Sequence, residues 1–152
     1  MDSTDRKILA LLQKNARMTV KELAGKVSLS APSVAARIQK MEDTGVISGY
    51  HAVINAEMAG YPIRAFIQVQ VKVKRRADFF KHVKRRREVM ACHCITGDYD
   101  MLIEGVFPRT RDISSFVESL QEFGETKTYI VFSEIIEHRG LQIETEDTER
   151  VT

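Results

Sequence analysis

The segment from Ser30 to Gly45 has the residue types that could read nucleic acid in a groove. Val34, Ile38 and Met41 recur at helical spacing and predict a helix that is buried along that side. Small side chains follow one another on the opposite side near the start of this helix, and polar or basic ones lie toward its end. A helix that lies in a major groove needs this order. Small residues at its start let the backbone approach the DNA closely, and polar or basic residues further along donate hydrogen bonds to bases and phosphates. The candidate contact residues are Ser30, Pro32, Ser33, Ala36, Arg37, Gln39 and Lys40.

Two further helices must position this one. Apolar residues at helical spacing predict a first helix over 4–15. The sequence Thr19-Val20-Lys21-Glu22 is a capping box and starts a second helix at Thr19. Thr19 is a further candidate contact residue. Ser28-Leu29-Ser30 forms a turn, and Ser30 caps the third helix with Pro32 in its first turn and Gly45 at its end. Two short helices joined by a tight turn predict a helix-turn-helix that binds DNA.

The segment 46–55 predicts a hairpin with Ser48-Gly49 as its turn, which would be the wing of a winged helix. The alternative for the whole region is a three-helix bundle that serves packing only, because helix-turn-helix patterns are short and produce false matches.

The pattern changes after a linker at 55–61. Strict alternation from Ile63 to Val73 predicts a strand buried on one face. A charged helix over 76–88, strands over 89–96 and 101–107, a second helix with Ile113 and Phe116, and a strand over 126–136 follow. The order βαββαβ is the ferredoxin-like arrangement. The predicted fold is therefore α+β, with a winged helix-turn-helix domain over 1–54, a ferredoxin-like domain over 62–143 and an acidic tail over 144–152.

The third and fourth predicted strands are apolar on both faces, as the neighbours Tyr129 and Ile130 illustrate. Two helices can cover only one face of the sheet, so the other face requires a partner. A second copy of the chain related by a two-fold axis is the simplest partner, and such a dimer also matches a palindromic DNA site. We expect a homodimer or a larger assembly of dimers, such as an octamer.

Cys92-His93-Cys94 suggests a metal site, but alternation in a strand directs His93 away from the two cysteines. Zinc requires four ligands, and no second ligand cluster is present, so we expect buried structural cysteines and no metal or other cofactor. No triad order, phosphate-binding loop or carboxylate pair indicates an enzyme.

Composition restricts the class of protein further. The chain has 152 residues, 23 Lys and Arg against 21 Asp and Glu, and two Cys. These values are typical of a globular protein and exclude a disulfide-built secreted fold. The longest early apolar run, 8–12, is far shorter than the roughly 20 residues of a membrane span. With a polar N-terminus, these features predict a cytoplasmic location.

The charge is unevenly distributed: nine of the sixteen residues in 72–87 are Lys or Arg, and Asp78 is the single acid among them. A solvated helix face is one interpretation of this stretch. An auxiliary path for DNA is the other, because wrapping needs only phosphate neutralisation.

In order and spacing, these residues resemble the Lrp/AsnC family of transcriptional regulators, also called feast/famine regulatory proteins. The resemblance covers about Asp2 to Ile143. In the first domain it is carried by the runs 5–9, 22–24, 27–30, 37–42 and 45–50, and in the second by Cys92 and the runs 96–100 and 126–131.

The resemblance implies a sequence-specific regulator that binds double-stranded DNA and responds to an amino acid or a related metabolite. It implies an effector site at Gly97, Asp98, Tyr99 and Asp100, with Thr126 and Thr128 from the fourth strand. A glycine turn offers backbone N–H groups for a carboxylate, and an aspartate suits an ammonium. The alternatives are that Gly97-Asp98 is simply a hairpin turn, and that the protein is an architectural DNA-bending or wrapping protein without an effector.

Overall fold

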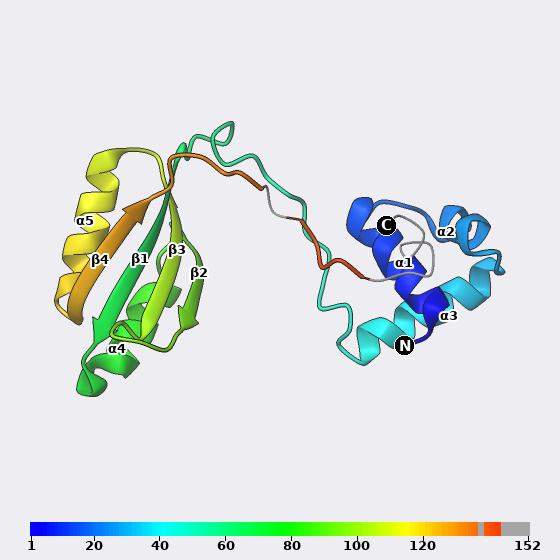
Figure 1. Ribbon diagram of the computed structural model, residues 1–152, viewed down its shortest axis with the longest axis horizontal. Helices are drawn as coiled ribbons and strands as arrows, with labels where there is room; N and C mark the ends of the chain where they lie inside the picture. The colour runs from blue at the N-terminus through cyan, green and yellow to red at the C-terminus, as the bar shows by residue number, and fades with distance from the viewer. Residues whose placement is uncertain (137–138, 144–152) are drawn as a thin grey trace, which may run out of the picture. The chain divides into compact units, whose positions relative to one another are not determined.

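The computed structural model describes residues 1–136 and 139–143, which form two compact units (Figure 1). Unit 1 contains residues 1–53 and the described residues from Ile136 onward, and unit 2 contains Ile54–Ile135. The sequence pattern places 136–143 in the second domain, whereas the structure places the described part of that segment against unit 1. There the Gln13 side-chain amide donates a hydrogen bond of 3.1 Å to the Leu141 carbonyl. The predicted acidic tail lies outside the described residues.

Unit 1 is built on three helices, α1 (Ser3–Lys14), α2 (Val20–Val27) and α3 (Ala31–Asp43). The capping box at Thr19 is present as predicted, and Ser30 caps α3. Ser28 ends α2 in the left-handed conformation, at φ 54°, which makes the turn between α2 and α3 tight. The fully buried residues Ile8, Leu23 and Val34 join the three helices in one apolar core.

The predicted wing is wrong, because the described residues 46–55 contain no strand. A two-residue hairpin turn needs a positive φ at its first central position, and Ser48 has none. An isolated pair of strands is also marginal in water unless it packs on a core, and Val46, Val53 and Ile54 are all exposed here.

Unit 2 has the predicted ferredoxin-like arrangement. Its elements are β1 (Ile63–Val71), the 3₁₀ turn η1 (Val73–Arg75), α4 (Arg76–Lys84), β2 (Val89–Cys94), β3 (Met101–Phe107), α5 (Thr110–Gln121) and β4 (Gly124–Ile130). The strands pair antiparallel in the order β2-β3-β1-β4. Figure 1 shows α4 and α5 on the same face of the sheet.

Alternation along β1 determines which face the helices cover. Ala65, Ile67 and Val69 are fully buried and pack with Phe79 of α4 and Phe116 of α5. Their neighbours on β1 point to the opposite face, which no described helix covers. Apolar side chains on this uncovered face include Phe66, Leu102, Val106 and Tyr129, as the strand register shows.

Two predictions about the strands are corrected. The fourth strand ends at Ile130 and not at Ile136. One further backbone hydrogen bond, from the Val131 N–H to the Arg64 carbonyl at 2.9 Å, lies beyond the last pair, and β1 itself begins at Ile63, so it has no residues to pair with the rest of 131–136. Phe132 and Ile135 therefore lie outside the strand and are exposed. Cys92 and Cys94 are also exposed rather than buried, because β2 is an edge strand with a neighbour on one side only. None of the described helices is long and apolar enough to cross a bilayer.

Candidate functional site

The outer face of α3 is the candidate contact surface of unit 1. Pro32, Ser33, Ala36, Gln39 and Lys40 are exposed, while Val34 and Met41 on the other side are buried. Capping orders the start of the helix, since the Ser30 hydroxyl accepts from the Ser33 backbone N–H at 3.3 Å and lies 2.8 Å from the Ser33 hydroxyl. The structure therefore presents five of the predicted contact residues on one helix face.

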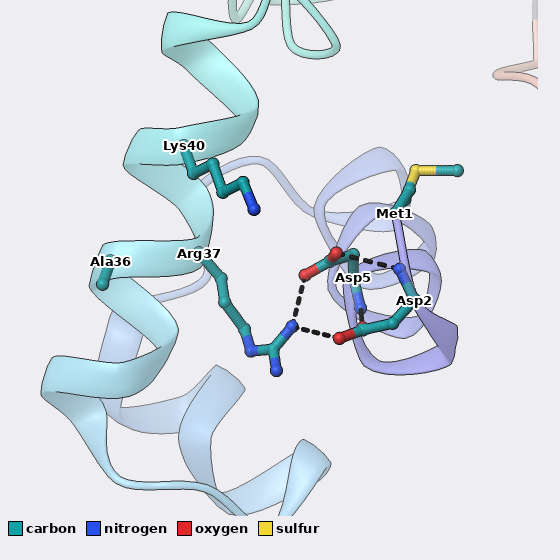
Figure 2. A pocket seen from close by; sticks show the side chains of 6 residues that line it. All are labelled: Met1, Asp2, Asp5, Ala36, Arg37 and Lys40. Atoms are coloured by element: carbon teal, nitrogen blue, oxygen red, sulfur yellow. Dashed lines mark hydrogen bonds and ion pairs between the residues drawn. The ribbon is translucent and has the colours of Figure 1, made fainter.

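Arg37 has a different role in the structure. One guanidinium nitrogen lies 2.6 Å from a carboxylate oxygen of Asp2 and 2.7 Å from one of Asp5, at the start of α1 (Figure 2). Hydrogen bonds to Asp2 and Asp5 raise the pKa of Arg37. The Asp5 backbone N–H and the Arg37 guanidinium lower the pKa of Asp2. Arg37 therefore joins α3 to α1, and its charge is largely compensated within the unit.

Lys40 lies one helical turn from Ala36, beside the same two carboxylates. Figure 2 shows it at an open hollow that it lines together with Met1, Asp2, Asp5, Ala36 and Arg37. The hollow has a volume of about 500 Å³. Within residues 1–136 and 139–143, Lys40 forms no ion pair or side-chain hydrogen bond. It is therefore the uncompensated cation of the α3 face.

Two of the predicted contact residues have partners that orient them. The Gln39 amide donates to the Asp43 carboxylate at 2.9 Å, one turn further along α3. The Thr19 hydroxyl donates to the Glu22 carboxylate at 2.8 Å and accepts from the Glu22 backbone N–H at 3.2 Å. Thr19 therefore uses its side chain to cap α2, whereas Gln39 is held by a single side-chain contact that a base could replace.

Three exposed cations near the ends of α2 were not among the predicted contact residues: Arg17, Lys21 and Lys26. Their side chains have no ion-pair partner in the described part of the chain. The sequence signal that could have identified them is the position of Arg17 and Lys21 on either side of the Thr19 cap. In a helix-turn-helix, the helix before the recognition helix crosses the DNA backbone.

The predicted effector turn connects β2 and β3, and its last residue is already engaged. One Asp100 oxygen accepts from the Val71 backbone N–H at 2.7 Å, and the other lies 2.7 Å from an Arg76 nitrogen. Asp100 thus fixes the end of β1 and the start of α4 to the turn. A ligand ammonium at Asp100 would have to compete with both of these contacts.

The rest of the turn is open. The backbone N–H groups of Gly97, Asp98 and Tyr99 donate to no other described residue, and the Asp98 carboxylate is exposed without a partner in that part of the chain. Gly97 has φ +117°, a conformation that other residues rarely adopt. The geometry therefore leaves Asp98 and the turn N–H groups available to a zwitterion.

Thr126 and Thr128 lie on the helix-covered face of β4. The strand register pairs them with Val69 and Ile67, whose side chains are buried beneath the helices. The turn leads into β3, and β1 lies between β3 and β4, so one strand separates the two threonines from the β3 end of the turn. Lys127 points to the uncovered face, where its amino group lies 5.4 Å from the centre of the Tyr129 ring. Interaction with Tyr129 is the first cause, and the charge of Tyr99 a further cause, of the raised pKa of Lys127.

Comparison with known proteins matches both parts of the chain. Residues 1–42 match the AsnC-type helix-turn-helix domain, and residues 64–141 match the Lrp/AsnC ligand binding domain. The HTH-type transcriptional regulator YezC of Bacillus subtilis is 36% identical over 133 residues, which cover 88% of this chain and 94% of that protein. The proline dehydrogenase transcriptional activator of Rhodobacter capsulatus is 33% identical over 150 residues, with 92% and 96% covered.

Solved structures give the same result. The L-Met complex of a transcriptional regulator from Neisseria meningitidis superposes with a TM-score of 0.85 at 33% identity, covering 91% of this chain and 94% of that one. Escherichia coli AsnC superposes with a TM-score of 0.82 at 26% identity, covering 91% and 96%. These relatives are regulators of transcription and not enzymes.

The ion pair between Arg37 and the start of α1 generates a stability prediction. Replacing Arg37 by Gln removes the partner of two carboxylates and should lower the melting temperature of unit 1 at neutral pH. A lowered pKa of Asp2 means that its contribution is complete above the ordinary value of 3.8 and is lost as pH falls through the lower folded value. The difference between wild type and Arg37→Gln should therefore shrink in acid. Thermal unfolding of the full chain, followed by circular dichroism across this pH range, measures it.

Lys40→Gln removes the same charge from the same helix without breaking an ion pair, so it should melt close to wild type. Equal melting temperatures for Arg37→Gln and wild type at neutral pH would contradict a structural role for Arg37.

Proposed function

The chain belongs to the Lrp/AsnC family of helix-turn-helix transcriptional regulators, and from this premise we propose that it binds specific sites in double-stranded DNA through α3 under the control of an amino acid bound to unit 2. The observation that carries the DNA part is the outer face of α3. This face is small at its start and polar toward its end. Its helix packs on α1 and α2 through Ile8, Leu23 and Val34, and all three helices begin with a side-chain cap.

Each residue of that face has a chemical task in this proposal. Pro32, Ser33 and Ala36 are small enough to bring the backbone of α3 close to the floor of the major groove. Gln39 can form two hydrogen bonds with an adenine once it releases Asp43. Lys40 supplies a positive charge to a phosphate, because it forms no ion pair within the described residues.

The effector part is supported by the β2–β3 turn and by one relative. The turn offers three unused backbone N–H groups for a carboxylate and the exposed Asp98 carboxylate for an ammonium. A regulator that is 33% identical to this chain has been solved as a complex with L-Met. We assign the ammonium to Asp98 rather than Asp100, because both Asp100 oxygens already hold parts of the fold together.

The assembly part is supported by the uncovered face of the sheet. Phe66 and Leu102 are half-buried there, and Tyr129 is 45% exposed, although no described helix covers them. A second copy of the same face would exclude water from these side chains, and each square ångström of apolar surface buried contributes about 25 cal/mol. A two-fold dimer would also present two α3 helices to two half-sites.

The DNA proposal predicts a specific loss for Lys40→Ala. The variant should fold as wild type but bind a selected duplex more weakly, and the slope of log affinity against log salt should fall by about 0.9, the value for one phosphate that is no longer neutralised. Fluorescence anisotropy titrations at several salt concentrations measure both quantities. Lys14→Ala, which removes a charge from the last turn of α1, is the matched control. Unchanged affinity and slope in Lys40→Ala would remove this side chain from the DNA interface.

The effector proposal predicts that at least one of the natural amino acids binds and changes DNA affinity. Coupling between two such sites is usually 1–3 kcal/mol, or about 5- to 150-fold in affinity. Asp98→Asn should abolish this response while leaving effector-free DNA binding intact, and Glu118→Gln on α5 is the charge-matched control. Isothermal titration calorimetry against each amino acid provides the test. If no amino acid binds, the architectural function without an effector becomes the better description.

The assembly proposal predicts that Leu102→Glu dissociates the dimer, because it places an unpaired charge in the centre of the buried face. Ser114→Glu adds the same charge to the exposed side of α5 and should leave the dimer intact. Sedimentation velocity of the full chain over a concentration series measures the mass. A wild-type protein that sediments as a monomer at micromolar concentration would contradict the assembly.

A further inference from the structure

The positive charge of unit 2 is concentrated in one segment. Residues 72–87 contain nine Lys and Arg and one acid, whereas the rest of unit 2, residues 54–71 and 88–135, contains four Lys and Arg and ten Asp and Glu. The total charge of the unit conceals this separation. In the fold, the segment comprises η1, α4 and the turn that leads to β2.

Three of the nine cations are used to hold the segment to the rest of the unit. Arg76 pairs with Asp100 at 2.7 Å, and Arg86 pairs with Glu88 at 3.3 Å. The Arg75 guanidinium lies 3.6 Å from Glu122 and 5.0 Å from the centre of the Phe123 ring. These interactions compensate the three charges.

The other six cations are exposed and have no acidic partner within residues 1–136 and 139–143. We name them the basic surface; its members are Lys72, Lys74, Lys81, Lys84, Arg85 and Arg87. Phe79 and Val83 are buried on the inner side of α4. At 100° per residue, Lys81 and Lys84 lie on the opposite, outer side. The nine residues of α4 span about 13.5 Å, a length along which duplex DNA carries roughly eight phosphate charges.

We propose that the basic surface binds the phosphate backbone of the DNA whose sequence α3 reads; this inference rests on the proposed function. Six uncompensated cations within one segment of sixteen residues repel one another, and a polyanion relieves that repulsion. Lys and Arg on flexible stems suit binding to the DNA backbone, which needs charge but no sequence information. The surface therefore adds affinity on any sequence, and α3 supplies the selectivity.

The alternative partner would be the acidic remainder of unit 2 in a second copy of the chain. Six of its ten acids are already paired within the unit: Glu88, Asp100, Glu104, Asp112, Glu122 and Glu134. The other four, Glu57, Asp98, Glu118 and Glu125, come from the linker, a turn, α5 and β4. The described residues of unit 2 therefore offer no compact acidic surface complementary to six cations, and DNA fits better.

The test compares Lys81→Gln/Lys84→Gln with Arg109→Gln/Arg111→Gln, a double variant that removes the same charge from the start of α5. Both are made in the full chain and titrated with a selected duplex and with a longer duplex that extends the same site. We expect the first variant to lower the salt slope on the longer duplex by up to about 1.8, or 0.9 for each phosphate that is no longer neutralised. Its relative preference for specific over random sequence should not change. Lys81→Arg/Lys84→Arg should restore the wild-type slope, and the α5 variant should retain it.

The possible outcomes are distinguishable. If Lys40→Ala weakens binding but the Lys81/Lys84 variant keeps the wild-type slope, the inference is overturned and the proposed function stands. If the Lys81/Lys84 variant changes the sedimenting mass without DNA and keeps the slope, the surface binds a second copy of the chain, which also overturns the inference. If wild-type protein binds no duplex, the proposed function fails and the inference fails with it.

Discussion

The side chains buried in the core of each unit are all apolar, and this constraint determines where the polar and charged side chains lie. Among the described residues, no polar or charged residue is buried. An unpaired charge in an apolar core is costly, so every ionisable side chain must remain at the surface or at the margin of a core. The chemistry of the protein is therefore surface chemistry, and the two cores serve to fix which surfaces are presented.

Under this constraint, a cation is distinguished by whether the fold supplies its counter-charge. Arg37 and Lys40 are neighbours on α3, yet Arg37 bridges Asp2 and Asp5 while Lys40 has no partner in the described chain. Arg76 and Lys81 show the same contrast on α4, where Arg76 pairs with Asp100. The paired members position helices, and the unpaired members are available to an anion. A surface ion pair contributes at most about 1 kcal/mol on its own, so besides this small stabilisation it orients the elements that it joins.

The helices and strands could be predicted well from local signals. Capping boxes, the Ser30 cap and the alternation in β1 act over a few residues, so the sequence is sufficient to recognise them. The predicted wing and the long fourth strand failed for a common reason. A strand exists only if a neighbour supplies hydrogen bonds along its length; the described residues give 46–55 no strand partner, and β1, which begins at Ile63, gives 131–136 one backbone hydrogen bond, from Val131 to Arg64. Composition alone does not reveal a missing partner.

The sequence by itself determined the two-part organisation, the helix-turn-helix, the βαββαβ order, the position of the glycine turn and the concentration of charge in 72–87. Only the tertiary structure decided which of the singled-out residues remain available for binding. The pairing of Arg37 with Asp2 spans 35 positions, and the hydrogen bond between Asp100 and Val71 spans 29. Strand register likewise directed Thr126 and Thr128 toward the helices and Lys127 away from them. Residues so far apart along the chain come into contact only when the helices and strands pack. The sequence pattern does not show which of them will be close in space.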